Sequence, residues 1–458
     1  MNYVIIELAN YIMVLLLGIY TLLSFVALKR VENDNRKGIY AVLAIMTFLI
    51  LSTGMITIYL YELEHPVLEQ PTNYILCLFF AQVIVLIFIC TLFSLIYTGF
   101  SRLALNHMCL MLSVGFIIQT RLSMVDHTLN HAIRQFIIIA ISLILFLIIP
   151  AVIKHCNFLR KLTYVYGICG AAALGIVLTL GRSVNGSKLS YNVFGLTFQP
   201  SEFVKIFFAF FLAGLLYKTY RLGKITLSAI LASIFVLTLV ASKDLGSALI
   251  FYLMFVVVVY TASGRLRYFI GGLIGMGGAS FVAYQLFEHV RIRIAIWQDP
   301  WTDIDRTGYQ LTQSLFAIGT GGWFGMGLGR GTPETIPFVD EDFVFSAISE
   351  EMGVVFGLLL IMVLLNVVLL YLYTGMRIHD RFYRLVAVGL SVSFATQIIL
   401  TIGGGTRLIP LTGVTLPLIS NGGSSVMATI ILFAVMQGIY MLRYEELEGG
   451  HTTVEEES

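Results

Sequence analysis

Long uninterrupted runs of apolar side chains limit what this chain can fold into more than any other feature. Many of these runs have about 17–25 residues, the length that crosses a bilayer's hydrocarbon core as an α-helix. Hydrophobic residues make up 58% of the chain, charged residues make up 12%, and the mean hydropathy is +0.90. These values lie well outside the range of soluble globular proteins. The runs also lack the apolar–polar alternation of membrane barrel strands. We therefore predict an all-α fold, a polytopic transmembrane helical bundle.

We predict about thirteen membrane spans. They lie at roughly residues 4–28, 38–61, 74–98, 103–119, 135–153, 163–181, 203–217, 225–241, 246–262, 268–287, 352–374, 385–403 and 424–442. Residues 1–102 form a separate three-span segment, since no polar cluster in them indicates a site. Residues 103–443 form the core, and residues 444–458 form a short acidic tail that we expect to be solvated and without a fold of its own.

The distribution of basic residues predicts the orientation of the chain. An odd number of spans places the two termini on opposite sides of the membrane. Seventeen Lys and Arg residues fall in short loops on one side, against ten on the other. The positive-inside rule assigns the richer side to the cytoplasm. We therefore expect the N-terminus outside and the C-terminus in the cytoplasm.

One long segment between spans, residues 288–351, is unlike its surroundings. It holds ten of the chain's twenty-six carboxylates, and we expect this outer loop to carry the chemistry. Crowded carboxylates at a low-dielectric surface raise one another's pKa, which tunes a general acid or base toward neutral pH. They could equally hold a divalent cation, or form a solvated acidic loop. Asp342 differs from its neighbours because aromatic and branched residues follow it, where the loop re-enters the protein.

The same segment contains a glycine-dense piece, Gly319–Gly331. It is not a P-loop, because no Gly-Lys-Ser/Thr sequence follows. We interpret it as a tight re-entrant turn that presents backbone N–H groups and Arg330 to an anionic head group.

Two polar clusters lie at the outer ends of later spans. Glu202 and Lys205 are three residues apart behind Pro200, so they share a helix face and can form an ion pair. Such a pair inside a membrane is costly and indicates function, although capping and packing would also explain it. Asp244, which follows Lys243, is well placed as a helix N-cap, and that role alone would account for it.

A third cluster, residues 409–425, contains two prolines and paired glycines. This composition predicts broken, non-helical backbone at the membrane edge. Such backbone is tolerated only where it is buried in protein or lines a cavity.

Taken in this order and on one membrane face, these clusters resemble the FtsW/RodA/SpoVE family, the SEDS peptidoglycan polymerases. The resemblance covers about residues 103–443. The motifs that carry it are Gln199-Pro200-Ser201-Glu202 with Lys205, Asp244-Leu245-Gly246, Gly308-Tyr309-Gln310-Leu311 with Gln313-Ser314, Gly325-x-Gly327-Leu328-Gly329, Asp342-Phe343-Val344-Phe345 with Glu350-Glu351, and Pro410-Leu411-Thr412-Gly413 with Leu416-Pro417 and Gly422-Gly423-Ser424-Ser425. The chain departs from the family pattern at Lys243, where a proline is usual, and at Asn421, where a tyrosine is usual.

The resemblance implies a ten-helix core to which three N-terminal helices are added, in a bacterial cell membrane. It implies an inverting peptidoglycan glycosyltransferase that polymerises lipid II at the outer face, for elongation, division or sporulation. It also implies a class B penicillin-binding protein as partner. No cofactor is certain, and a divalent cation, Mg²⁺ or Mn²⁺, is left open. The membrane composition argues against a nucleic-acid partner.

The resemblance also assigns site residues. The essential aspartate of the family falls on Asp342, which is expected to be the catalytic base. The expected substrate-binding residues are Glu202, Lys205, Lys243, Asp244, Gln313, Arg330, Ser424 and Ser425. The departing pyrophosphate needs positive charge, from Arg330, Lys205, Lys243 or a cation. The alternatives are a lipid II flippase, which intramembrane charges and broken helices would suit, and a scaffold that recruits a transpeptidase.

Overall fold

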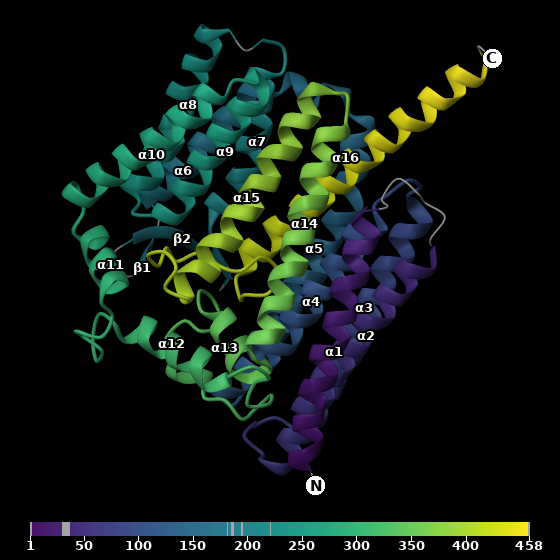
Figure 1. Cartoon of the computed structure of the whole chain (residues 1–458), viewed down its shortest axis with the longest axis vertical. Coiled ribbons are helices and arrows are strands. Elements are labelled where there is room, and N and C mark those ends of the chain that lie inside the picture. Colours follow the sequence, from purple (N-terminus) through teal and green to yellow (C-terminus); the bar gives the residue numbers. More distant parts are fainter. Residues whose placement is uncertain are drawn as a thin grey trace.

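The computed structural model describes residues 2–29, 37–180, 182–184, 187–193, 196–219 and 221–456. Within these residues the chain is a bundle of long helices, shown in Figure 1. The first three are α1 (Asn2–Lys29), α2 (Lys37–Glu64) and α3 (Asn73–Ile96). They pack on one another and on α4 (Arg102–Ser123), and α1 also packs along α14 (Val354–Arg377).

The middle of the bundle consists of helices with few exposed residues. Besides α4, these are α7 (Pro200–Leu216), α15 (Arg381–Gly405) and α16 (Gly423–Glu456). Helix α5 (Asn130–His155) packs along α16 over much of its length. Short 3-10 turns, η1 (Met124–Asp126) and η2 (Asn157–Lys161), follow α4 and α5.

Four further helices surround α7 on the side away from α1. They are α6 (Thr163–Leu180), α8 (Leu222–Ala241), α9 (Leu245–Ser263) and α10 (Leu266–Leu286). Helix α10 packs on α9 and has no buried residue, so it forms the outer edge of the bundle.

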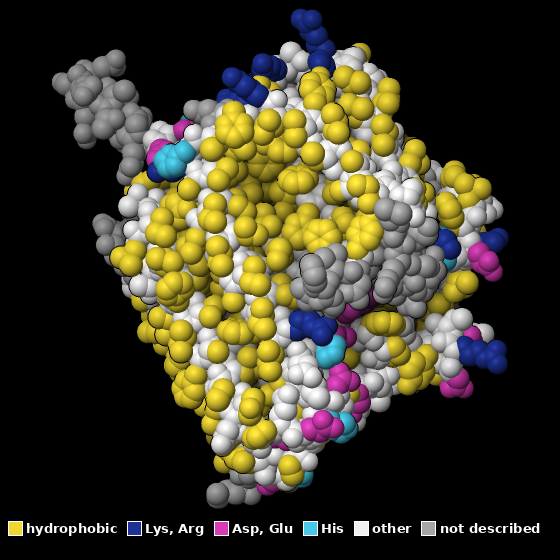
Figure 2. Space-filling view, turned by 180° about the vertical axis from the view of Figure 1, so that it is seen from behind, with side chains coloured by type: hydrophobic (Ala, Val, Ile, Leu, Met, Phe, Trp, Pro, Cys, Tyr) yellow, Lys and Arg dark blue, Asp and Glu magenta, His cyan; other side chains and the backbone are white. Residues whose placement is uncertain are grey.

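The prediction of a multi-pass helical membrane protein is confirmed. Within the described residues a helix occupies each of the thirteen predicted positions, and eleven of these helices are long and apolar enough to cross a membrane. The other two, α6 and α7, are shorter, so the count of thirteen spans stays a prediction. Figure 2 shows a broad apolar belt, with Lys and Arg side chains at its upper end and with most of the acidic and His side chains, together with further basic ones, toward the lower end.

A small antiparallel sheet, which the all-α prediction did not include, precedes α7. Its strands are β1 (Arg182–Val184), β2 (Ser187–Val193) and β3 (Leu196–Phe198), in that spatial order. The sequence of β2 alternates apolar Leu189, Tyr191 and Val193 with polar residues, a pattern typical of strands. Strand pairing satisfies backbone groups that no helix satisfies here.

The long acidic segment contains short helices and is not an irregular loop. It contains α11 (Glu288–Gln298), α12 (Tyr309–Gly321), the 3-10 turn η3 (Pro333–Thr335) and α13 (Val344–Met352). These short elements lie together at one end of the bundle, the end where α1 begins, as Figure 1 shows. The C-terminus lies at the opposite end.

The acidic tail also differs from the prediction. Instead of ending near residue 442, α16 continues to Glu456. Glu445 forms an ion pair with Lys154 at 2.5 Å, and Glu446 accepts a hydrogen bond from the backbone N–H of His379 at 2.9 Å. The Glu and Leu residues that follow Arg443 favour helix, so the last span extends beyond the apolar region.

Candidate functional site

Asp342 lies in a turn that immediately precedes α13. Its backbone N–H donates to the carbonyl oxygen of Phe338, a residue in the left-handed conformation with φ of 58°. The side chain is half-buried, and Phe343, which follows it, is 1% exposed. The chain therefore re-enters the protein directly after Asp342, as the sequence indicated.

The environment of Asp342 favours the protonated form of its carboxyl group. Burial raises the pKa of Asp342 to about 6, with the charge of Asp340 adding to the effect and that of Arg293 opposing it. Burial, together with the charges of Asp340 and Asp342, also raises the pKa of Glu341 to about 7. With a pKa of about 6, the carboxylate of Asp342 is mostly ionised at neutral pH and is still a stronger base than an ordinary aspartate.

Arg293, on α11, is the cation that faces this carboxylate. Its charge interacts with both Asp342 and Asp244, and its Nη1 donates to the carbonyl oxygen of Thr412 at 3.4 Å. Burial lowers the pKa of Arg293, and the two carboxylates act against this effect. The charge of Arg293 therefore acts on two aspartates that are about a hundred residues apart in the sequence.

Helix α11 is held in place by a reciprocal contact with the end of α15. The side chain of Arg407 donates from Nε to the carbonyl oxygen of Trp297 at 2.9 Å and from Nη2 to that of Gln298 at 2.6 Å. In return, Nε1 of Trp297 donates to the carbonyl oxygen of Arg407 at 3.1 Å. These contacts fix the helix that carries Arg293.

Asp244 caps α9, as predicted. Its Oδ1 accepts from the N–H of Ser247 at 3.0 Å, while its Oδ2 lies 3.4 Å from both Ser201 Oγ and Gln199 Nε2. Burial raises the pKa of Asp244, and the hydrogen bonds from Ser247 act against this. The N–H of Gln199 donates to Ser424 Oγ at 2.9 Å, which connects the cap to the start of α16.

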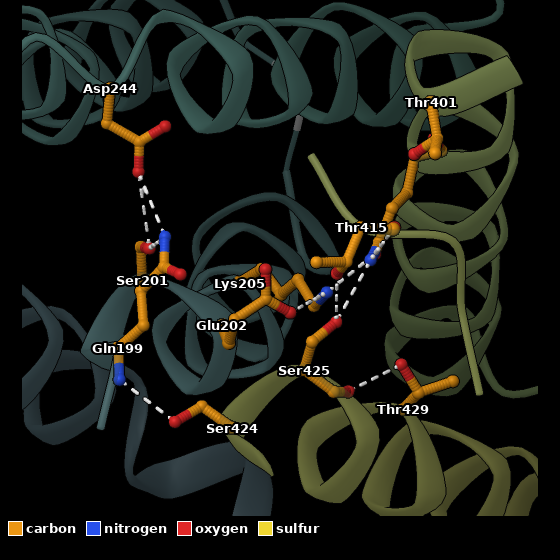
Figure 3. A network of polar contacts seen from close by, with 11 residues as sticks. Gln199, Ser201, Glu202, Lys205, Asp244, Thr401, Thr415, Ser424, Ser425 and Thr429 are labelled. Atoms are coloured by element: carbon orange, nitrogen blue, oxygen red, sulfur yellow. Dashed lines mark hydrogen bonds and ion pairs between the residues drawn. The ribbon is translucent and has the colours of Figure 1, made fainter. Parts of the chain in front are cut away.

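Glu202 and Lys205 form the predicted ion pair, with 2.7 Å between Lys205 Nζ and Glu202 Oε2. Both residues are buried, at 7% and 2% exposure. Nζ of Lys205 also donates to Oε1 of Gln397 on α15 at 2.8 Å. Figure 3 shows the ion pair beside the hydrogen-bonded group of Asp244, Ser201 and Gln199. Ser201 and Glu202 are consecutive residues of α7, so the two groups are adjacent.

The network continues into the broken segment before α16. Gln397 donates from Nε2 to the carbonyl oxygen of Thr415 at 3.0 Å and to Ser425 Oγ at 3.3 Å. Thr415 Oγ1 donates to Ser425 Oγ at 2.7 Å. Residues 410–416 are non-helical, as the prolines and glycines predicted. Val414 and Leu416 are buried, residues 410–412 line a cavity, and Gly413 is exposed. The hydroxyl groups of Ser424 and Ser425 are therefore hydrogen-bonded within this network.

The remaining predicted residues lie apart from this network. Lys243 is exposed, has a φ of 63°, and its charge acts on His289 together with that of Arg293. Gln313 is half-buried on α12. Arg330 lines a different cavity, next to Tyr61 of α2.

Several backbone N–H groups of the glycine-dense piece are used within the fold and are not presented to a ligand as we expected. Met326 N–H donates to the carbonyl oxygen of Glu350, and Gly327 N–H donates to that of Glu351, each at 2.9 Å. The loop lies on the junction of α13 and α14, where its N–H groups are used in the fold.

Beside Arg293 lies an apolar cavity of about 400 Å³. Its walls come from α8, α9, α10, α11, α15 and residues 409–412. Arg293 is the charged side chain among the residues that line it, and the lining also includes Leu245 and Ala248, which follow Asp244. The guanidinium of Arg293 therefore lies at the wall of a mostly apolar cavity.

Among the residues that the structure describes, no three His, Cys, Asp or Glu side chains gather where they could hold a metal ion. Asp340 Oδ2 accepts from Asn421 Nδ2 at 2.9 Å, and Asp342 faces Arg293. The described residues therefore offer no cluster of three such side chains to the divalent cation that the sequence left open, and the involvement of a cation stays untested.

Sequence reasoning did not find Arg293 or Gln397. Arg293 belongs to a basic–apolar alternation on α11, Arg291-Ile292-Arg293, which was an available signal. Gln397 was a polar residue within an otherwise apolar span, which also indicates function in membranes. Both residues acquire their roles from contacts over long sequence separations.

These observations define a multi-pass helical membrane protein in which acidic, basic and amide side chains meet at one end of the bundle. Residues 100–445 match the FtsW/RodA/SpoVE family, described as cell cycle protein. The chain belongs to this family.

Curated relatives include peptidoglycan glycosyltransferase RodA of Mycobacterium tuberculosis, which is 37% identical over 362 residues, 74% of this chain and 77% of the relative. Stage V sporulation protein E of Bacillus subtilis is 37% identical over 285 residues, 59% of this chain and 75% of the relative. A probable peptidoglycan glycosyltransferase FtsW of Aeromonas salmonicida is 35% identical over 275 residues, 57% of this chain and 69% of the relative.

Two solved structures share the fold. A chain from a peptidoglycan synthase complex matches with a TM-score of 0.62 and 24% identity, over 76% of this chain and 99% of that chain. The rod shape determining protein RodA of Thermus thermophilus matches with a TM-score of 0.55 and 23% identity, over the same shares.

Proposed function

We propose that this chain is a peptidoglycan glycosyltransferase that polymerises lipid II at the outer face of a bacterial cell membrane. The names of its relatives, peptidoglycan glycosyltransferase RodA and probable peptidoglycan glycosyltransferase FtsW, support the reaction class. The observation that carries the proposal is Asp342, a half-buried carboxyl with a raised pKa, on which the charge of Arg293, at the wall of an apolar cavity, acts.

In the proposed reaction Asp342 accepts the proton of an acceptor sugar hydroxyl. The hydroxyl oxygen forms a bond to the anomeric carbon of the growing strand as the bond from that carbon to the pyrophosphate oxygen breaks. The proton moves to Asp342, and the electron pair leaves with the pyrophosphate on its lipid carrier. A single base with no covalent intermediate inverts the anomeric carbon.

Arg293 is suited to hold the departing pyrophosphate. Its guanidinium lies at the wall of the apolar cavity and acts on the charge of Asp342. A fixed cation stabilises developing negative charge most effectively where water is excluded. The cavity takes the part of the carrier nearest the pyrophosphate, and the rest of the chain extends into the bilayer. Lys243 supplies a second positive charge near His289 on the same face.

The Glu202–Lys205 pair is suited to position these groups. Its members are satisfied by each other and by Gln397, and the network reaches Ser425 and Thr415. We assign the pair to holding α7, α15 and the start of α16 together, so that residues 409–416 present a fixed wall to the substrate.

We further propose that the N-terminus and Asp342 lie outside the cell and that the C-terminus lies in the cytoplasm. The charge distribution supports this orientation, since seventeen Lys and Arg residues fall in short loops on the predicted cytoplasmic side and ten on the other side. The polymerised strand would then meet a class B penicillin-binding protein, the expected cross-linking partner.

The test uses the purified full-length chain with lipid II, alone and with a class B penicillin-binding protein. We expect glycan ladders on a gel, their loss in Asp342→Asn, and their retention in Asp305→Asn, an exposed control in the same segment. Lipid II movement across vesicles that persists in Asp342→Asn, without any ladder, would instead identify a flippase. Ladders that persist in Asp342→Asn would remove the catalytic assignment.

A further inference from the structure

A second cavity, which we call the joint pocket, lies where the three N-terminal helices meet the core. Its volume is about 730 Å³. Its lining comes from α1, the end of α2 and the loop that follows, the end of α4 with η1, and residues 326–334. Helices α1 and α2 precede the range 100–445 that matches the family, so this pocket depends on the part of the chain outside that match.

The glycine-dense piece is shaped to receive the N-terminal helices. Gly329 has a φ of 88°, and a Cβ built on it would lie 2.7 Å from the ring of Tyr61 on α2. Gly327 has a φ of 104°, and its Cβ would lie 2.9 Å from Ile6 on α1. At both glycines the positive φ and the close contact disfavour a side chain, so α1 and α2 pack directly against the backbone of this loop.

The walls of the joint pocket are fixed by hydrogen bonds. Glu62 Oε1 accepts from the N–H groups of Val67 and Leu68 at 2.9 and 2.8 Å. The carbonyl oxygen of His127 accepts from the N–H of Glu69 at 2.9 Å. The loop after α2 is therefore tied to η1, and the cavity between them is a built feature.

The lining carries charges of both signs beside apolar side chains. Arg121 and Arg330 supply guanidinium groups, and Glu64 and Glu334 supply carboxylates. Ile6, Val67, Met124, Val125 and Met326 supply the apolar part of the wall. A ligand that matches this lining has anionic oxygens, an ammonium group and an apolar portion.

The pocket lies at the ends of membrane-length helices. Glu64 ends one of these helices, and Met124 and Val125 lie in the last turn of another, which ends at Asp126. Ile5 and Leu63, the sequence neighbours of Ile6 and Glu64, are exposed at 40% and 54%. Helix ends of this kind are expected at the level of lipid headgroups, and the volume of the pocket is in the range of small-molecule sites.

We propose that the joint pocket binds the zwitterionic headgroup of a membrane aminophospholipid. The carboxylates of Glu64 and Glu334 receive the ammonium group, and Arg330 receives the phosphate. The apolar side chains of α1 and η1 cover the glycerol and the first part of the acyl chains. The headgroup then connects α2 to the glycine-dense piece.

Such a ligand would act on the segment that contains Asp342. Arg121 Nε donates to Glu351 Oε1 at 2.9 Å, and its Nη2 donates to the carbonyl oxygen of Gly331 at 3.2 Å. Two residues earlier on α4, Gln119 Nε2 donates to the carbonyl oxygen of Asp340 at 3.1 Å. The end of α4 therefore contacts the wall of the joint pocket and the acidic turn, and occupancy of the pocket restrains both.

The test measures lipid binding to the full-length chain by native mass spectrometry. The probes are phosphatidylethanolamine, phosphatidylcholine and phosphatidylglycerol with identical acyl chains. All three lipids carry the phosphate. Among them, only phosphatidylethanolamine has an ammonium group with N–H donors for carboxylates, since the ammonium of phosphatidylcholine is quaternary and phosphatidylglycerol has none. We expect preferential binding of phosphatidylethanolamine, which falls roughly tenfold in Glu64→Gln/Glu334→Gln. Glu69→Gln, on the same exposed loop, serves as the matched control and should bind as the unaltered chain does.

Arg330→Gln should weaken binding of all three lipids, since it removes the phosphate partner. Hydrogen exchange provides a readout independent of catalysis: phosphatidylethanolamine should slow exchange of residues 326–332 in the unaltered chain and have no effect in the double Glu variant. Equal binding of the three lipids, or unchanged binding in the Glu variant, would overturn the proposal. Displacement of the lipid by O-phosphoethanolamine at equal concentration would show a soluble zwitterion site and would also overturn it.

Discussion

The rate of glycan polymerisation should fall as the pH drops through the pKa of Asp342. A base works only when it is deprotonated, so activity is present above the pKa and lost below it. With a pKa of about 6, the ionised fraction of Asp342 is about 91% at pH 7 and about 9% at pH 5. The chemical step should therefore slow roughly tenfold between these values. An aspartate with an ordinary pKa would lose almost nothing over the same range.

Arg293 gives this prediction a sharper form. Its positive charge holds the pKa of Asp342 below the value that burial and Asp340 would produce together. Arg293→Gln should therefore move the acidic limb of the profile to higher pH, on the order of one unit. Arg293→Lys keeps the charge and should leave the limb nearer its original position. The shift is separate from any loss of pyrophosphate binding, because that loss lowers the rate at every pH.

The assay measures initial rates with saturating lipid II from pH 5 to pH 8.5 at constant ionic strength. Glu341→Gln serves as the control for the neighbouring carboxyl, whose pKa is also raised, to about 7. A tenfold limb that survives in this variant belongs to Asp342. A profile that is flat down to pH 5, or one that Arg293→Gln leaves unmoved, would refute the reasoning.

Three further predictions concern packing. Lys205→Met should destabilise the fold by about 3–5 kcal/mol, because it leaves the Glu202 carboxylate buried without its partner. The double variant Glu202→Gln/Lys205→Met should unfold at a higher temperature than Lys205→Met, and a thermal unfolding scan that shows no such rise would contradict this. Gly329→Ala should cost about 1–3 kcal/mol, through its positive φ and its approach to Tyr61, and should be partly rescued by Tyr61→Ala. Asn10→Leu removes two hydrogen bonds from α1, one to the carbonyl oxygen of Phe324 in the glycine-dense piece and one to that of Glu351, and should cost about 1 kcal/mol. Limited proteolysis should then cleave residues 322–332 faster, and unaltered cleavage there would contradict a role of α1 in holding the glycine-dense piece.

Local sequence signals predicted much of the site. Pro200, Glu202 and Lys205 lie within two turns of one helix, so their order and pairing follow from the helical repeat. Asp244 lies directly before an apolar run, which makes it a cap. The apolar residues after Asp342 placed it where the loop re-enters the protein. The ion pair, the cap and this re-entry point need only neighbours in the chain, whereas the catalytic role of Asp342 was implied by the family resemblance.

The sequence did not reveal the partners that these residues meet. The contact of Lys205 with Gln397 spans 192 positions, and the contact of Arg293 with Thr412 spans 119. No polar cluster in the first three spans indicated a site, yet α1 and α2 line the joint pocket. A periodic pattern shows which face of a helix is apolar, but it does not show which helix will cover that face.

By itself, the sequence determined that the chain is a helical membrane protein with its acidic residues gathered in one segment. The reason is that a bilayer leaves long apolar runs no other regular conformation, because every backbone group must be satisfied within the helix. Tertiary structure alone decided that the charge of Arg293 acts on both Asp342 and Asp244, and that the N-terminal helices line a charged cavity. These arrangements depend on how the helices pack, and packing is set by the shapes of all the contacting surfaces together.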